Sequence, residues 1–144
     1  AMGYPDREGE RPLLDRRADR TTQTPSVDTV SSEISVSELQ RVVERVHVET
    51  EIREYIVDLS RATRGDSRVE IGISPRGTQR LFEAARAQAV LNGREYVAPD
   101  DVRTIAHGVF DHRIVLTSEA SIQGTTKHEV IADVLSASEV PAMP

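Results

Sequence analysis

The 144-residue sequence has no cysteine and very few aromatic residues. The absence of thiols excludes disulfides, thiolate chemistry and cysteine-based metal sites. Because aromatic residues make up only 3% of the chain, a core has to be built mostly from Leu, Ile, Val and Ala. Cores of this kind are usually helical, since small side chains let helices approach closely. The length suits one domain with a sizeable core.

Long apolar runs and basic clusters are also missing. No apolar stretch approaches the roughly 20 residues that span a bilayer, and no signal peptide opens the sequence. The formal net charge is −6, without a sustained Lys/Arg run. Nucleic-acid binding requires basic groups that neutralise phosphates, so this charge weighs against it. We expect a cytoplasmic protein without membrane insertion and without a nucleic-acid partner.

Catalytic motifs are scarce. The sequence has neither a Gly-x-Ser-x-Gly elbow nor a Gly-x-x-x-x-Gly-Lys-Ser/Thr phosphate loop. Two acids, Asp100 and Asp101, are explained by the positive end of a helix. The histidines lie in four different segments without the four-residue spacing of a ligand pair: His47, His107, His112 and His128. We therefore expect no catalytic residue, no metal site and no activity for this stretch as an autonomous enzyme.

Composition divides the chain into four parts. Residues 1–19 are predicted to form a hinge and a first, highly charged helix, which Pro12 would kink or restart. Residues 20–34 are polar and are expected to form an exposed loop. Residues 35–137 are predicted to be a helical bundle, and residues 138–144 a frayed tail.

Apolar spacing of three and four residues predicts the helices of the bundle. The first is opened by a capping box at Ser35 and Glu38, and the last runs from about Thr126 to Ser136. The expected apolar stripes, in chain order, are Leu39/Val42/Val43/Val46, Ile52/Tyr55/Ile56/Leu59/Ala62, Leu81/Ala84/Ala85/Gln88 with Phe82 and Leu91 at its margin, Val102/Ile105/Ala106/Val109/Phe110, and Val130/Ile131/Val134/Leu135. The second, third and fourth stripes should meet in one core. The predicted fold is an all-α bundle of about five to six helices.

The stretch Ser74-Pro75-Arg76-Gly77 is the most informative in the chain. Ser74 can accept a backbone N–H bond as an N-cap, and Pro75 suits the first helical position. Arg76 then lies in the first turn and points away from the buried face. Its guanidinium is a fixed cation with a fork that matches phosphate oxygens. From these residues alone, a solvated arginine after a well-formed cap is the plainer interpretation.

A series of short motifs extends this pattern along the chain: Gly3-Tyr4-Pro5, Tyr55-Ile56-Val57-Asp58-Leu59, Arg61-Ala62-Thr63-Arg64, Gly72-Ile73-Ser74-Pro75-Arg76, Ala84-Ala85-Arg86-Ala87, Gly93-Arg94-Glu95-Tyr96-Val97, Pro99-Asp100-Asp101-Val102 and His112-Arg113. In this order and spacing, the chain resembles the C-terminal helical lid of MoxR-type AAA+ ATPases over nearly its whole length. The resemblance implies that Arg76 occupies the sensor-2 position, with Ser74, Pro75 and Gly77 shaping the helix start. It also implies that Gly3, Tyr4 and Pro5 form the joint between core and lid, beside the adenine.

The same resemblance implies the cofactor and the partners. ATP with Mg²⁺ would be bound mainly by an AAA+ core upstream in the same chain. Neighbouring subunits of a ring, and proteins with von Willebrand factor A domains, would be further partners. The phosphate loop, the acidic Mg²⁺ motif and the arginine finger of such ATPases are absent here, so this stretch is not expected to hydrolyse ATP alone.

The sequence departs from the family pattern at one further position, and two alternative functions remain open. The family often has Ser or Thr before the proline of the last core helix, where this chain has Ala98, so that cap lacks a side-chain acceptor. A helical protein-interaction module without nucleotide contact would treat Arg76 as an ordinary surface residue. The lid of a magnesium-chelatase-type ATPase subunit would keep Arg76 in the same role but differ in its client.

Overall fold

A computed structural model describes residues 6–19 and 35–142. The chain divides into two units, residues 1–33 and residues 34–144, and each is described by itself. The predicted hinge at residues 3–5, the predicted loop at residues 20–34 and the last two residues lie outside the described parts.

The first unit contains one helix, α1 (Arg7–Ala18). It begins at Asp6, whose Oδ1 accepts a 2.8 Å hydrogen bond from the Gly9 N–H. A kink or a restart was expected at Pro12, and the helix runs through this residue as one element, so Pro12 does not restart it. Its apolar side chains, Leu13 and Leu14, are exposed. No described residue of α1 is buried.

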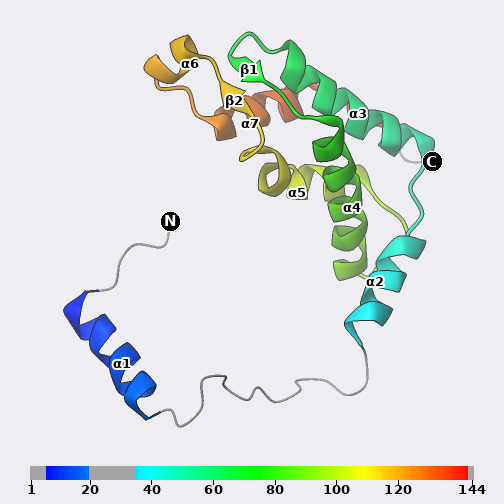
Figure 1. Ribbon diagram of the computed structural model, residues 1–144. Coiled ribbons are helices and arrows are strands. Elements are labelled where there is room, and N and C mark those ends of the chain that lie inside the picture. Colours follow the sequence, from blue (N-terminus) through cyan, green and yellow to red (C-terminus); the bar gives the residue numbers. More distant parts are fainter. Residues whose placement is uncertain (1–5, 20–34, 143–144) are drawn as a thin grey trace. The chain divides into compact units, whose positions relative to one another are not determined.

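The second unit is a helical bundle with a small two-stranded sheet (Figure 1). Its elements are α2 (Val36–Arg45), α3 (Thr50–Gly65), β1 (Val69–Ile71), α4 (Pro75–Leu91), α5 (Pro99–Phe110), β2 (Val115–Leu116), α6 (Ser118–Ile122) and α7 (Lys127–Ala137). The all-α class is therefore confirmed. The short helix α6 was not predicted, and with α1 it brings the described part of the chain to seven helices. None of these helices has the length and apolar character to cross a bilayer.

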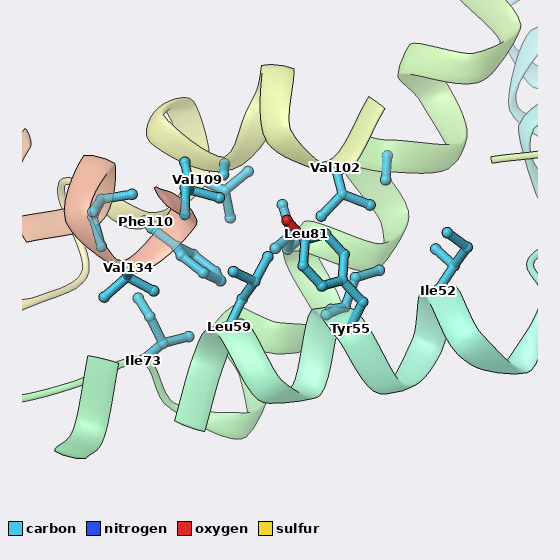
Figure 2. Close-up of a cluster of buried hydrophobic side chains, with 14 of the residues drawn as sticks. Ile52, Tyr55, Leu59, Ile73, Leu81, Val102, Val109, Phe110 and Val134 are labelled. Carbon is cyan, nitrogen blue, oxygen red and sulfur yellow. The ribbon is translucent and has the colours of Figure 1, made fainter. Parts of the chain in front are cut away.

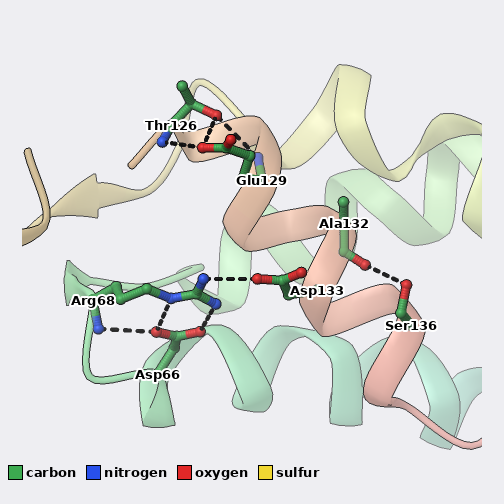
Figure 3. Close-up of polar contacts among 7 residues, drawn as sticks. All are labelled: Asp66, Arg68, Thr126, Glu129, Ala132, Asp133 and Ser136. Atoms are coloured by element: carbon green, nitrogen blue, oxygen red, sulfur yellow. Dashed lines mark hydrogen bonds and ion pairs between the residues drawn. The ribbon is translucent and has the colours of Figure 1, made fainter. Parts of the chain in front are cut away.

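Local capping explains where several helices begin. At α2, Ser35 accepts the Glu38 N–H and Glu38 accepts the Ser35 N–H, which confirms the predicted capping box. Thr126 and Glu129 make the same reciprocal pair at the start of α7 (Figure 3). Each pair satisfies backbone N–H groups that the helix itself leaves free.

Helices α3, α4, α5 and α7 enclose one core, and the three predicted stripes do meet there (Figure 2). Ala62, predicted as the last member of the α3 stripe, is exposed instead. Ala85, Ala89 and Ala106 are fully buried, and these small side chains let α4 and α5 approach closely. At three positions the prediction for α4 differs from the structure, and the first is Ala84, which is only half-buried. The buried residue of its last turns is Ala89, whereas Gln88 is half-buried, and Leu91 is 82% exposed.

The predicted core stripe on α2 is also wrong. Only Val46, just after the helix, is buried, and Val43 is half-buried. Leu39 and Val42 are about half exposed, at 51% and 48%. The reason is that α2 contacts the bundle near one end of α4, where Val46, Val90 and Gly93 line a groove. The chain after α2 is then fixed by the His47 N–H, which donates to the Glu95 carbonyl at 2.8 Å.

The two-stranded sheet lies at the other end of α4, where that helix begins (Figure 1). Strands β1 and β2 pair antiparallel, with Val69 opposite Leu116. Arg68 fastens this end to α7 by donating to Asp66 and to Asp133, each at 2.7 Å (Figure 3). The hydrogen bond from Arg68 lowers the pKa of Asp66. These contacts tie the end of α3 to α7, close to the segment that leads into α4.

Candidate functional site

The candidate site is the first turn of α4 and the residues that hold it. Ser74 is the N-cap of this helix, and its Oγ accepts a hydrogen bond from the Gly77 N–H at 3.2 Å. Pro75 occupies the first helical position, where its missing N–H costs nothing. The cap and the helix start predicted from the sequence are therefore confirmed.

The segment before Ser74 is clamped onto the end of α3. The Ile73 N–H donates to Thr63 Oγ1 at 3.0 Å, and the Ile73 carbonyl accepts from Arg64 Nε at 2.6 Å. Thr63 Oγ1 in turn donates to the Ser60 carbonyl. The side chain of Ile73 is fully buried. Both backbone groups of Ile73 are thus satisfied, and the direction in which α4 leaves this point is fixed.

Gly72 lets the two segments come this close. A Cβ atom on Gly72 would lie 2.8 Å from the Cα of Arg64 and 2.9 Å from its backbone N. Those distances are far below van der Waals contact, and helix backbone cannot move aside as a flexible side chain can. The glycine is therefore required by the close approach of the chain to α3.

Gly77 makes a second close contact on the other side of the helix start. A Cβ on Gly77 would lie 2.8 Å from Ile73 Cγ2 and 3.4 Å from Arg113 Cδ. Arg113, which follows the cap of α5, is held to that helix because its Nη1 donates to the Val109 carbonyl. The aliphatic part of the Arg113 side chain therefore packs over Gly77. This contact joins the end of α5 to the beginning of α4.

Arg76 itself is exposed. Within residues 6–19 and 35–142 it makes no ion pair and no side-chain hydrogen bond, whereas Arg80, one turn later, pairs with Glu83 at 2.6 Å. Each of the other described helices has at least one acidic residue in its first turn, and α4 has none. A cation at the positive end of a helix is unfavourable by about 0.3–1 kcal/mol. The first turn of α4 therefore combines the Arg76 cation with the positive end of the helix, and no acid in that turn balances them. An anion bound there would be stabilised by both.

A second polar network, which the sequence interpretation missed, fixes the opposite end of α4. Asp101 is 1% exposed and accepts hydrogen bonds from both terminal nitrogens of Arg94, from Asn92 Nδ2 and from the Ala98 N–H. Burial alone would raise the pKa of Asp101, but these hydrogen bonds outweigh it and lower the pKa. Ala98 offers no side-chain acceptor, as expected, so only the reciprocal half of a capping box is made.

Comparisons with known proteins show the family of the chain. Residues 61–134, which include the whole α4 start, match the family described as AAA lid domain. The uncharacterized protein YeaC of Bacillus subtilis is 34% identical over 140 residues, which cover 97% of this chain and 43% of YeaC. Chaperone MoxR1 of Mycobacterium tuberculosis is 30% identical, over 97% of this chain and 39% of that protein.

A further relative and a solved structure extend the match. Protein MoxR of Paracoccus denitrificans is 39% identical over 84 residues, covering 49% of this chain and 25% of that protein. A crystal structure from Cytophaga hutchinsonii, described as a candidate ATPase, superposes with a TM-score of 0.75 at 26% identity, over 98% of this chain and 45% of that one. The chain spans less than half the length of the relatives that it matches most fully. It belongs to the AAA lid domain family and is a lid domain of the MoxR type of AAA+ ATPase.

Proposed function

We propose that this lid senses bound ATP through Arg76, in the sensor-2 role. The observation that carries the proposal is the charge pattern at α4, whose first turn combines an exposed arginine with the absence of any acid. A polyphosphate is the anion that this arrangement fits best, because a guanidinium fork and a helix N-terminus both favour phosphate oxygens. The ATP, with its Mg²⁺, would be bound mainly by an AAA+ core outside these residues.

The hydrogen bonds and close contacts around the start of α4 fix the backbone position of Arg76. Ser74, Pro75 and Gly77 set the first turn, while Gly72 and Ile73 hold it against α3. A contact between the guanidinium and the γ-phosphate would close the lid onto the core, and the contact would be lost when that phosphate leaves. Gly3, Tyr4 and Pro5 would form the joint, beside the adenine, about which the lid moves.

The wider role that we propose is ATP-driven, chaperone-like remodelling of partner proteins by a cytoplasmic ring. One relative carries the name Chaperone MoxR1, which supports this class of activity. Neighbouring subunits of the ring would be the first partners. Proteins with von Willebrand factor A domains would be the clients. The net charge of −6 gives no support to nucleic acid as a client.

Removing the Arg76 guanidinium is expected to lower ATP turnover by at least about ten-fold in a full-length protein that carries this lid and its core. The melting temperature should change little, since an exposed arginine contributes little to stability. Arg76→Lys should restore only part of the activity, because an ammonium keeps the charge but not the fork. Steady-state hydrolysis and thermal melting of wild type, Arg76→Ala and Arg76→Lys measure both effects.

Arg80→Ala is the matched control, because Arg80 lies one turn later on the same helix and is also exposed. It should keep turnover within about two-fold of wild type. If Arg76→Ala instead melts several degrees lower and retains full turnover, Arg76 is structural and the sensor role is wrong.

A protein-interaction module without nucleotide contact is the second candidate, and the apolar face of α2 favours it. Val36, Leu39 and Val42 are all substantially exposed there. An exposed apolar face of this kind is typical of a surface that contacts another protein. The two candidates differ in the expected effect of Arg76→Ala. A nucleotide-sensing lid should lose ATP turnover, whereas a pure interaction module should keep its affinity for the partner protein and should show no ATP turnover to begin with.

A further inference from the structure

Three side chains from two helices meet at the end of α5. His107 lies in the last turn of α5, Asp111 follows as the cap of that helix, and His128 lies in the first turn of α7. His107 Nδ1 is 3.0 Å from Asp111 Oδ1, and His128 Nδ1 is 2.9 Å from Asp111 Oδ2. The two imidazole rings stack, with centroids 3.9 Å apart and planes inclined by 26°.

This arrangement brings together the donor atoms of a metal site. The candidate ligand atoms of the three residues all lie within 4.8 Å of one another. Ligand atoms on a tetrahedral Zn²⁺, at about 2.0–2.1 Å from the ion, are about 3.3 Å from one another. The present Nδ1–Oδ distances are close to that value. To hold one ion in place of the two shared protons, the stacked imidazole rings would turn so that both Nδ1 lone pairs point at it.

We propose that His107, Asp111 and His128 form a binding site for one divalent transition-metal ion, with Zn²⁺ as the best fit. Two imidazoles and a carboxylate suit Zn²⁺, Co²⁺ or Ni²⁺, whereas Mg²⁺ and Ca²⁺ prefer oxygen ligands throughout. Three protein ligands leave a fourth position for water. The side chains of His107 and Asp111 are only 28% and 30% exposed, so the site is partly shielded from solvent.

The ion would link α5 to α7 at the end of the bundle that carries the α4 start. Asp111 lies two residues before Arg113, whose stem covers Gly77. A metal at this point would tie the start of α7 to the end of α5, from which Arg113 reaches the first turn of α4. The site uses none of the residues proposed to contact ATP, so either proposal can fail without the other.

Calorimetric titration of Zn²⁺ into the 144-residue chain, freed of any polyhistidine tag, tests the site. We expect one ion per chain. His128→Ala and Asp111→Asn should each weaken binding by at least about ten-fold. His128 is 67% exposed, so His128→Ala should fold normally, and its melting temperature without metal checks this. His112→Ala is the matched control, because His112 lies next to Asp111 but outside the cluster, and it should bind as wild type does.

Two further readouts make the result decisive. Zn²⁺ should raise the melting temperature of wild type by several degrees and leave that of His128→Ala unchanged. Co²⁺ should give the visible absorption of a four-coordinate site, whereas Mg²⁺ should have no effect on melting. Failure of wild type to bind Zn²⁺ at about 100 μM, or equal binding by wild type and His128→Ala, would overturn the proposal.

Discussion

Replacing Gly72 with alanine is expected to destabilise the bundle by about 3 kcal/mol. The new Cβ would lie 2.8 Å from the Arg64 Cα, and that helix backbone cannot yield. The chain would have to leave α3, which breaks the hydrogen bonds from Ile73 N to Thr63 Oγ1 and from Arg64 Nε to the Ile73 carbonyl. The fully buried Ile73 side chain would be displaced as well.

Gly65→Ala is the matched control for this prediction. Gly65 is the last residue of α3, and a Cβ there would meet nothing within 4 Å. Alanine in a helix is favoured over glycine, so this variant should be neutral or more stable by up to about 1 kcal/mol. Denaturant unfolding of the 144-residue chain compares the two. Equal stability of Gly72→Ala and wild type would mean that the segment does not approach α3 as closely as described.

Asp101→Asn is expected to cost a similar amount, about 3 kcal/mol. The asparagine has nearly the same shape, but its NH₂ group would replace one of the two oxygens. It would then face an Arg94 N–H together with either Asn92 Nδ2 or the Ala98 N–H. Arg94, whose side chain is 26% exposed, would lose its partner. Its partial exposure to water places the cost at the lower end of the range for a broken buried pair.

The dependence of this cost on pH follows from the lowered pKa of Asp101. Ionised Asp101 contributes its full stability above its ordinary pKa of 3.8, and the contribution is lost as the pH falls through its lower folded-state pKa. The difference between wild type and Asp101→Asn should therefore be constant from about pH 5 to pH 8 and shrink below about pH 4.

Asp100→Asn serves as the control, because Asp100 is exposed in the same turn. This variant should lose only the favourable interaction of a carboxylate with the helix N-terminus, about 0.3–1 kcal/mol. Urea unfolding across this pH range measures all three proteins. A constant wild-type to Asp101→Asn difference down to about pH 2 would contradict the assigned role of the carboxylate.

Helix starts and core stripes could be predicted because they depend on nearby residues. Ser35 with Glu38, and Ser74 with Pro75, each specify a cap within one turn. The stripes on α3, α4 and α5 follow from spacing along one helix, and they do enclose the core. The position of Arg76 followed from the same local signals, whereas its proposed role came from the family resemblance.

What could not be predicted depends on contacts between distant residues. The apolar spacing of α2 is that of a core helix, but only its end reaches the bundle, so Leu39 and Val42 stay exposed. Asp101 resembles an ordinary helix-end acid, and only its folded position shows that Arg94 and Asn92 converge on it. Gly72 gives no local signal, since its close neighbour, Arg64, lies on another element.

The histidines show the same limit. Asp111 and His128 are 17 residues apart in the chain and meet only because α5 and α7 pack together. Spacing within one helix cannot reveal a pair whose members lie on different elements. From the sequence alone no metal site was therefore expected, whereas the structure stacks His107 on His128 beside Asp111.

The most direct test of the central claim is the preference for ATP over ADP at equilibrium. A non-hydrolysable ATP analogue and ADP would be titrated into the full-length protein, as wild type, Arg76→Ala and Arg80→Ala. If Arg76 contacts the γ-phosphate, Arg76→Ala should weaken binding of the ATP analogue by at least about ten-fold and binding of ADP by less than about two-fold. Arg80→Ala should bind both nucleotides as wild type does. Equal losses for both nucleotides, or no loss for either, would contradict the assignment of Arg76 as the sensor of that phosphate.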